Sequence, residues 1–183
     1  MSTLRQKFLA FRIYRHRDTA AYGQLYDMNA ERIRRFLVFK VPRQEDADEL
    51  TSEVFLRGWE YMTTSHVDNA TALLFRIARN LVADFYRKYH PNEGIEFAET
   101  VPSAESLHDA VAIKLAGDDL IARLTLIKAE YRDVLVMRYL SEMNVGEIAS
   151  ALEKTPNSVR VLLHRAKKAL RAVSQGEDEG LPH

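Results

Sequence analysis

Hydrophobic residues recur at helical spacing along nearly the whole sequence, and this periodicity limits the possible folds more than any other feature. Apolar side chains return every three or four positions, which places them on one face of an α-helix. Alternation of β-branched and polar residues, which is typical of strands, never persists for five residues. The pattern therefore predicts an all-α protein, with two small helical domains separated by a segment of different composition.

The first helical block spans residues 1–90 and is expected to form a bundle of four helices. Its first helix contains Leu4, Phe8, Phe11 and Tyr14, which step along the chain by three and four. Asp18 is a suitable N-cap for the second helix, which Val41-Pro42 should stop because proline cannot continue a helix. The apolar stripe expected for this second helix is Leu25, Asn29, Ile33 and Phe36.

The other two helices of this block are expected over roughly residues 44–62 and 69–89, joined by a polar loop. Inward-facing positions are predicted to be Ala47, Leu50, Val54, Gly58 and Tyr61 in the third helix and Leu74, Ile77, Leu81 and Phe85 in the fourth. The third helix begins with an acidic cluster, Glu45–Glu53. In the fourth, cations alternate with Phe75, Tyr86 and Tyr89, with Trp59 upstream, a mixture that suits a single-stranded nucleic acid but is more often core packing.

Residues 91–119 have a different character from the blocks on either side. They contain seven acidic residues and a single lysine, together with two prolines and two glycines. A segment of this composition buries little apolar surface, so an acidic flexible linker is predicted. Residues 174–183 are expected to form a disordered tail for the same reason.

Two helix starts lie close together in the second block, residues 120–173. Asn144 and Glu147 have the spacing of a capping box, in which each side chain bonds the backbone amide of the other residue. Thr155-Pro156 provides a hydroxyl N-cap followed by proline at the first helical position. Two capped helices joined by about three residues have the dimensions of a helix-turn-helix.

The second helix of this motif separates apolar from basic residues. Its expected buried stripe is Val159, Leu163, Ala166 and Leu170, and between Lys154 and Arg171 there are six lysines or arginines and no acid. A helix that reads the major groove needs polar residues at its start and cations for the phosphates. The block is therefore predicted to bind duplex DNA, although a basic C-terminal helix can also serve solubility alone.

The formal net charge of the chain is zero, which taken as an average argues against a nucleic-acid partner. The charges are sorted, however, because residues 1–90 contain 15 basic and 11 acidic groups and residues 120–171 contain ten and five. The excess acid lies in the predicted linker and tail. Two basic modules remain compatible with nucleic acid.

Several other classes of protein find no support in the sequence. The absence of cysteine excludes a disulfide framework, a thiolate zinc site and a cysteine nucleophile. No uncharged run exceeds eight residues, far below the about 20 apolar residues of a membrane span, and the basic N-terminal segment lacks the apolar core of a secretory signal, so a cytoplasmic protein is expected. No phosphate loop or nucleophile elbow is present, and no cofactor or enzymatic activity is predicted. Glu105 and His108 leave a metal site or a helical adaptor as a minor alternative.

Three ordered motifs resemble those of the extracytoplasmic-function (ECF) sigma factors of bacterial RNA polymerase. The stretch DADELTSEVFLRGW at 46–59 is similar to one motif of the family's region 2, and FRIARNLVADFYR at 75–87 is similar to the next. YRDVLVMRYL at 131–140, followed by EIA at 147–149 and LHRAKKAL at 163–170, resembles region 4. The resemblance covers about residues 20–90 and 120–172 and implies two helical domains that bring core RNA polymerase to promoters without covalent chemistry.

The resemblance also implies roles for individual residues. Docking on core polymerase would use Asp48, Glu49, Leu50, Ser52, Glu53 and Phe55. Capture of the melted minus-ten strand would use His66, Asn69, Arg76, Arg79, Asn80 and Arg87. Reading of the minus-thirty-five duplex would use Thr155, Pro156, Asn157, Ser158, Arg160, Val161, His164, Arg165 and Lys168. An anti-sigma factor is a further partner that the family suggests.

Some positions depart from the family pattern. Ser52, Leu73 and Lys128 replace the usual glutamine, tryptophan and proline, and Glu153-Lys154 replaces Gly-Ile in the turn. Glu153 predicts a turn of altered geometry or lower stability, because glycine tolerates positive φ at no cost. Leu162 stands where arginine is frequent, which predicts weaker phosphate contact or an altered minus-thirty-five preference. The alternative function is a stand-alone helix-turn-helix regulator of duplex DNA, with the first block as a dimerisation domain.

Overall fold

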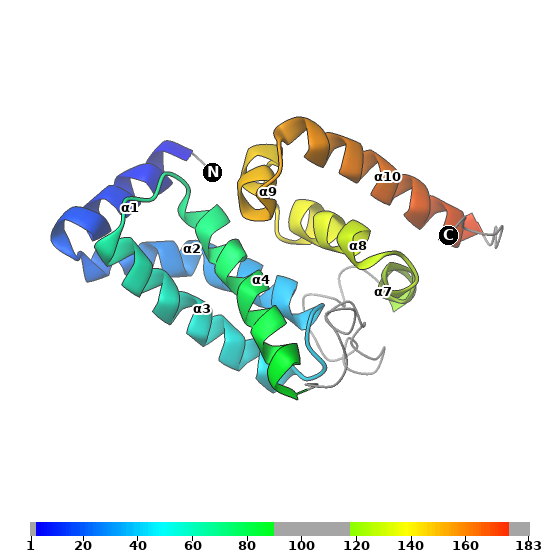
Figure 1. Ribbon diagram of the computed structural model, residues 1–183, viewed down its shortest axis with the longest axis horizontal. Coiled ribbons are helices and arrows are strands. Elements are labelled where there is room, and N and C mark those ends of the chain that lie inside the picture. The colour runs from blue at the N-terminus through cyan, green and yellow to red at the C-terminus, as the bar shows by residue number, and fades with distance from the viewer. Residues whose placement is uncertain (1–2, 90–117, 176–183) are drawn as a thin grey trace.

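The computed structural model describes residues 3–89 and 118–175, and this part of the chain is helical throughout, without strands. The helices are α1 (Thr3–His16), α2 (Thr19–Val38), α3 (Gln44–Thr64), α4 (Ala70–Tyr89), α7 (Asp118–Thr125), α8 (Ala129–Leu135), α9 (Val145–Leu152) and α10 (Pro156–Gln175), with a π-helical turn, η2 (Val136–Leu140), after α8. Helices α1–α4 form one bundle, and α7–α10 form a second domain beside it (Figure 1). The all-α prediction is confirmed.

Local signals set the start and the buried face of α2. The Asp18 carboxylate accepts a hydrogen bond from the backbone amide of Ala21 at 2.9 Å, as an N-cap does, and this bond is the main cause that lowers the pKa of Asp18. All four residues of the predicted stripe are fully buried. The helix ends at Val38, three residues before the Val41-Pro42 stop.

Helix α3 packs so closely on α4 that only glycine fits at the contact. A Cβ atom at Gly58 would lie 2.7 Å from Leu74 Cδ2 and 2.9 Å from the Tyr22 hydroxyl. The Tyr22 hydroxyl donates a hydrogen bond to the Phe55 carbonyl, and burial raises the pKa of Tyr22. The predicted inward position Tyr61 is wrong, because Tyr61 is exposed and the next residue, Met62, is buried in its place.

Helix α1 buries a different face from the one that its large apolar residues suggest. Leu9, Ala10 and Ile13 are buried against the bundle, together with Gln6, whereas Leu4, Phe8, Phe11 and Tyr14 are exposed. The spacing predicts the helix correctly but does not decide which side of it meets the core. Each of the two sides carries enough apolar surface to be buried.

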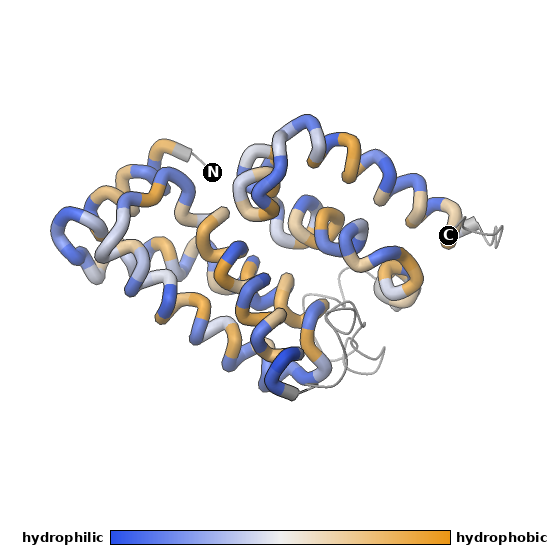
Figure 2. The backbone as a smooth tube through the Cα atoms, in the orientation of Figure 1, coloured by the Kyte–Doolittle hydropathy of each residue, from blue (hydrophilic) through white to orange (hydrophobic). Residues whose placement is uncertain are grey.

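A buried polar cluster joins three helices of the first domain. The Thr71 hydroxyl on α4 lies 3.0 Å from Gln6 Oε1 on α1 and 2.9 Å from Asn29 Oδ1 on α2. Asn29 in turn donates from Nδ2 to the Leu25 carbonyl at 2.8 Å. The Thr71 hydroxyl thus lies within hydrogen-bond distance of both side-chain oxygens and links the three helices inside the core. Figure 2 shows the mixture of hydrophobic and hydrophilic positions along these helices.

The second domain contains the predicted helix-turn-helix. The capping box is complete, because Glu147 N donates to Asn144 Oδ1 at 3.0 Å and Asn144 N donates to Glu147 Oε2 at 2.9 Å. Helix α9 ends at Leu152, and its C-cap residue, Glu153, has φ 54° and ψ 37°, the left-handed conformation. The turn thus has the backbone geometry that glycine usually adopts. A residue with a Cβ atom in this conformation lowers the stability of the fold.

The two domains pack against each other. Arg32 on α2 donates from Nε to the Ser141 carbonyl at 2.6 Å, and its guanidinium lies 3.8 Å from Glu147. Burial lowers the pKa of Arg32, and the two neighbouring carboxylates, Glu147 and Glu142, oppose this shift. Lys40 on the first domain forms an ion pair with Asp133 on α8.

Three predictions fall outside the described residues, wholly or in large part: the acidic linker at 91–119, the tail at 174–183, and the alternative site at Glu105 and His108. Among the helices of residues 3–89 and 118–175, none is long and apolar enough to cross a membrane.

Candidate nucleic-acid interface

Helix α10 presents the polar face that the sequence predicts. Ser158 N donates to Thr155 Oγ1 at 3.1 Å, so Thr155 is the N-cap and Pro156 occupies the first helical position. Val159 and Ala166 are fully buried on the opposite face. The predicted minus-thirty-five residues are all exposed: Thr155, Pro156, Asn157, Ser158, Arg160, Val161, His164, Arg165 and Lys168. The arrangement leaves a helix N-terminus and a row of cations free of core contacts.

Two neighbours of this face differ from what the sequence suggests. Leu162 is buried and packs in the core of the domain, where the family often has an arginine. A buried leucine makes no phosphate contact from this position, so weaker phosphate contact or an altered minus-thirty-five preference stays a prediction. Lys167 lies with its ammonium 5.3 Å from the ring centroid of Tyr139, an exposed residue of η2.

Two cations of α4 that are predicted to hold single-stranded DNA contact the second domain. Arg79 Nη1 donates to the Ala151 carbonyl at 3.2 Å, and Arg76 Nη1 lies 3.5 Å from Glu153 Oε1. Both acceptors belong to the C-terminal end of α9. Asn80 and Arg87 are exposed, and Arg87 pairs with Asp84 on its own helix. In this arrangement α9 covers part of the α4 surface.

A small cavity of about 180 Å³ lies beside these cations. Its walls come from the α3–α4 loop, from the adjoining ends of α3 and α4, and from α9: Tyr61, His66, Val67, Asp68, Asn69, Ala72, Leu73, Arg76 and Ser150. Asn69 Oδ1 accepts from Ala72 N at 3.0 Å, so Asn69 also caps α4. The structure thus brings together His66, Asn69 and Arg76, three of the six residues predicted for the minus-ten strand.

Two of the aromatic residues interleaved along α4, Phe75 and Tyr86, are not available for stacking on bases. Phe75 is fully buried against Phe36, and Tyr86 is buried with its hydroxyl donating to the Lys40 carbonyl at 2.8 Å. The core-packing interpretation is therefore correct for both. Tyr61 does line the cavity, although its helical spacing from Gly58 predicts an inward position.

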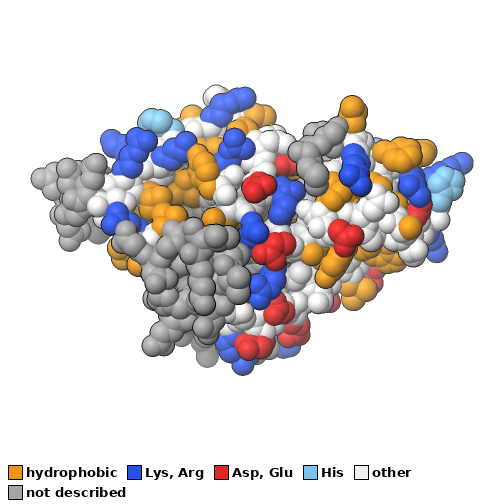
Figure 3. All heavy atoms as spheres, turned by 180° about the vertical axis from the view of Figure 1, so that it is seen from behind, with side chains coloured by type: hydrophobic (Ala, Val, Ile, Leu, Met, Phe, Trp, Pro, Cys, Tyr) orange, Lys and Arg blue, Asp and Glu red, His pale blue; other side chains and the backbone are white. Residues whose placement is uncertain are grey.

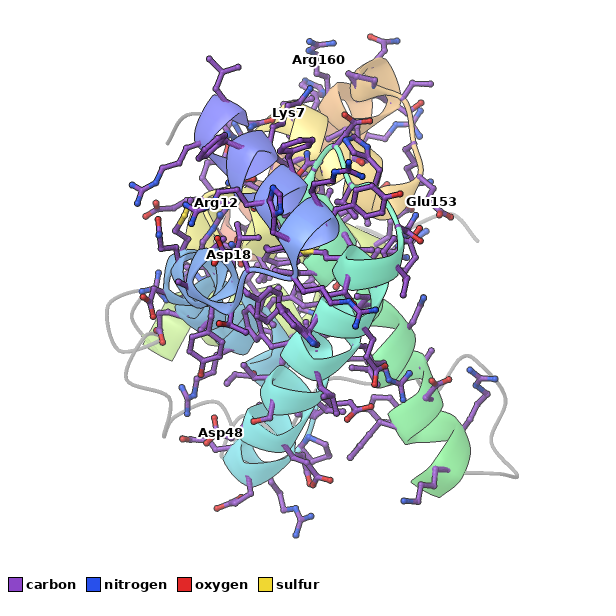
Figure 4. The ribbon with its side chains drawn as sticks, turned by 90° about the vertical axis from the view of Figure 1, so that its left-hand side faces the viewer. Lys7, Arg12, Asp18, Asp48, Glu153 and Arg160 are labelled. Carbon is purple, nitrogen blue, oxygen red and sulfur yellow. The ribbon has the colours of Figure 1, made fainter. Side chains whose placement is uncertain are left out.

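The acidic start of α3 faces outward beside a second cavity of about 480 Å³ between α3 and α4. Glu49, Ser52 and Glu53 line it, as does half-buried Leu50, while Asp48 is exposed nearby. Phe55 is buried and packs on α2, with its ring centroid 4.6 Å from that of Tyr26, so its side chain is not exposed on this surface. Figure 4 shows Asp48 at the end of the molecule opposite Arg160.

One residue of this surface escapes the sequence-based prediction. Leu56 also lines the cavity and is 55% exposed, one helical turn after Ser52 and Glu53. Its spacing of three residues from Glu53 and four from Ser52 places it on the same helix face, and this signal could have identified it. The acids themselves are partly neutralised, because Arg34 lies 2.6 Å from Asp48 and Arg57 lies 2.7 Å from Glu53.

Comparison with known proteins explains why these surfaces occur in one chain. Residues 25–90 match the family model of sigma-70 region 2, and residues 118–170 match that of sigma-70 region 4. The ECF RNA polymerase sigma factor BldN of Streptomyces coelicolor is 28% identical over 158 residues, which cover 84% of this chain and 60% of BldN. SigW of Bacillus subtilis, another such factor, is 24% identical over 166 residues, covering 84% of this chain and 89% of SigW. The chain belongs to the ECF sigma factors.

Solved structures share the fold. The sigma factor RpoE of Bartonella quintana, in complex with the anti-sigma factor NepR, superposes with a TM-score of 0.67 at 18% identity, covering 84% of this chain and 96% of that one. CnrH in complex with the cytosolic domain of CnrY gives 0.65 at 22% identity, covering 96% and 99%. The chain spans about 60% of the length of BldN, so it matches only part of that relative.

The departures from the ECF pattern fit the structure without rearrangement. Lys128, where the family usually has proline, is the N-cap of α8 with φ −51°, a value that proline can also adopt. Leu73, in place of tryptophan, is buried beside the small cavity, and Ser52 is exposed, with its hydroxyl donating to the Asp48 carbonyl at 3.1 Å. Among these departures, Glu153 is the one with a strained, left-handed backbone.

Proposed function

We propose that this chain acts as an ECF sigma factor that directs core RNA polymerase to specific promoters and promotes strand separation there. The observation that carries the proposal is the exposed face of α10, capped by Thr155 and free of acid, joined in one chain to a sigma-70 region 2 domain. No covalent step is required of the protein. It works in the cytoplasm, alongside the polymerase.

Reading of the minus-thirty-five element is assigned to the first turns of α10. Arg160 stands among exposed residues near the helix start, where a major-groove helix meets base edges, whereas Lys168 lies two turns further along, where cations meet phosphates. Arg160→Ala should weaken transcription selectively by promoter sequence. Lys168→Ala should weaken it uniformly and reduce its salt dependence. If Arg160→Ala reduced transcription equally from all minus-thirty-five variants, Arg160 would not contact the bases.

Capture of the melted minus-ten strand is assigned to the cavity at the α3–α4 loop and to the cations of α4. A base extruded from its stack costs a few kcal/mol, and His66, Asn69 and Arg76 around the cavity can offset that cost by binding it. Arg76 and Arg79 become available when α9 moves away from α4. Separation of the two domains is therefore part of the proposed mechanism.

Docking on core polymerase is assigned to the acidic surface of α3, with Leu56 as its apolar centre. Glu53→Lys reverses one charge of this surface and should reduce co-purification with core polymerase. Glu31→Lys is a matched control, because Glu31 forms the same kind of i,i+4 pair with Arg35 that Glu53 forms with Arg57, but on α2. Unchanged core binding by the folded Glu53→Lys protein would exclude the docking role.

The deciding experiment is run-off transcription with core polymerase on a library of promoters. Sequence-dependent initiation only in the presence of this protein is the expected result. Specific retardation of duplex DNA without polymerase, combined with no effect on initiation, would instead favour the stand-alone regulator. Because both structural neighbours with a high TM-score are complexes with a second protein, an anti-sigma factor is proposed as a further partner of this chain.

A further inference from the structure

Helix α1 exposes a row of large apolar side chains that no other described residue covers. Leu4, Phe8 and Phe11 are 77%, 60% and 48% exposed and follow one another at i, i+4 and i+7, so they form a single stripe. The opposite side of the helix holds Leu9 and Ile13 in the core. Clustered apolar side chains of this kind on a protein surface indicate an interaction site.

The charges around this stripe select an anionic occupant. The helix contains no acidic residue, and Arg15 falls within the stripe, while Arg12 and Lys7 lie on its two flanks. The Arg12 guanidinium lies 5.8 Å from the centroid of the Phe8 ring and also pairs with Asp18 at 2.5 Å. Figure 3 shows hydrophobic and basic side chains next to each other over α1, and Figure 4 shows Lys7 and Arg12 on this helix.

The same face is continuous with the cavity at the α3–α4 loop. The ring of Tyr14 meets that of His66 edge to face, with centroids 6.1 Å apart, and Lys7 Nζ lies 3.9 Å from Asp68 Oδ1. His66 and Asp68 both line the cavity. A strand that leaves the cavity over His66 therefore reaches Tyr14 first and then the exposed phenylalanines.

We propose that the outward face of α1 binds single-stranded DNA, namely the part of the melted strand that continues beyond the base held at the loop cavity. Phe8, Phe11 and Tyr14 provide surfaces for base stacking, and Lys7 and Arg15 provide cations for the phosphates, the combination that single-stranded binding requires. The inference rests on the proposed sigma function and extends it to a surface that lies outside the residues assigned to the minus-ten element.

The test uses holoenzyme assembled from the full chain and core polymerase, with two forked promoter templates. In the short fork the non-template strand ends at the minus-ten element, and in the long fork it continues for several nucleotides as a single strand. Phe8→Ala/Phe11→Ala should lose at least roughly fivefold affinity for the long fork and none for the short fork. Leu126→Ala, which truncates a 69% exposed residue between α7 and α8, serves as the control.

A second variant separates stacking from simple apolar contact. Phe8→Leu keeps apolar area but removes the ring, so it should lose about as much affinity for the long fork as Phe8→Ala. Equal affinity of the double variant and the wild type for the long fork overturns the proposal. Weaker assembly of the double variant with core polymerase in the absence of DNA also overturns it, because α1 would then dock on protein. A wild-type holoenzyme that shows no preference for forks containing the minus-ten element would refute the sigma function itself, and this inference with it.

Discussion

Replacement of Glu153 by glycine should make the protein more stable, although it removes a side chain that makes an ion pair. Glu153 holds φ 54° and ψ 37° at the end of α9, a conformation that costs a residue with a Cβ about 1–2 kcal/mol. Glycine avoids this cost but loses about 0.5–1 kcal/mol more chain entropy on folding. The pair with Arg76 is 3.5 Å long and its carboxylate is largely exposed, so its loss matters little. The expected net gain is about 0.5–1 kcal/mol.

Urea unfolding followed by far-UV circular dichroism measures this gain, provided that the m-value is unchanged. Glu153→Ala is the matched control, because it also removes the ion pair but keeps a Cβ atom in the left-handed conformation. The glycine variant should exceed the alanine variant by about 1 kcal/mol. Glu142, with φ 52°, offers an independent repeat of the same comparison. A glycine variant no more stable than the alanine variant, at both positions, would refute the reasoning.

Three further substitutions test the packing and capping described above. Gly58→Ala should destabilise the first domain by about 1–3 kcal/mol in urea unfolding, because its Cβ meets α4; an unchanged midpoint would mean that the helices separate freely. Thr71→Val should cost about 1–3 kcal/mol in thermal unfolding, because it leaves Gln6 and Asn29 without the hydroxyl, and Thr71→Ser should lose less. Asn144→Ala should cost about 1 kcal/mol and reduce amide protection in the first turn of α9, and retained protection would contradict the capping role.

Features encoded within a few neighbouring residues are the ones that the sequence predicts well. Asp18, Asn144 and Thr155 each cap a helix as expected, because a cap requires only its own side chain and an amide two or three residues away. The stripe of α2, including the polar Asn29, is also correct. The exposed face of α10 follows from the same local logic, since its apolar and basic residues separate cleanly around the helix.

Features that depend on contacts between distant segments are not predictable in this way. Helix α1 has apolar residues on two sides, and only the position of the rest of the bundle decides that Ile13 is buried and Phe8 is not. Near the end of α3, the buried position falls on Met62, one residue after Tyr61, where the helical spacing predicts it. Nothing near Arg79 in the sequence indicates that it bonds the Ala151 carbonyl, 72 residues away. The surfaces assigned to function remain predictions for the same reason.

The contact between α4 and α9 has a thermodynamic consequence. The acceptors that α9 offers to Arg79 and Arg76, a carbonyl and a carboxylate, are oxygen atoms of the kind that a phosphate would offer. In the proposed mechanism, the second domain and a DNA strand therefore compete for the same guanidinium groups. The apparent dissociation constant for the strand equals the intrinsic one divided by the fraction of molecules in which the domains are apart. Any partner that holds the domains apart increases affinity for the promoter without contacting it, and any partner that clamps them together acts as a competitive inhibitor.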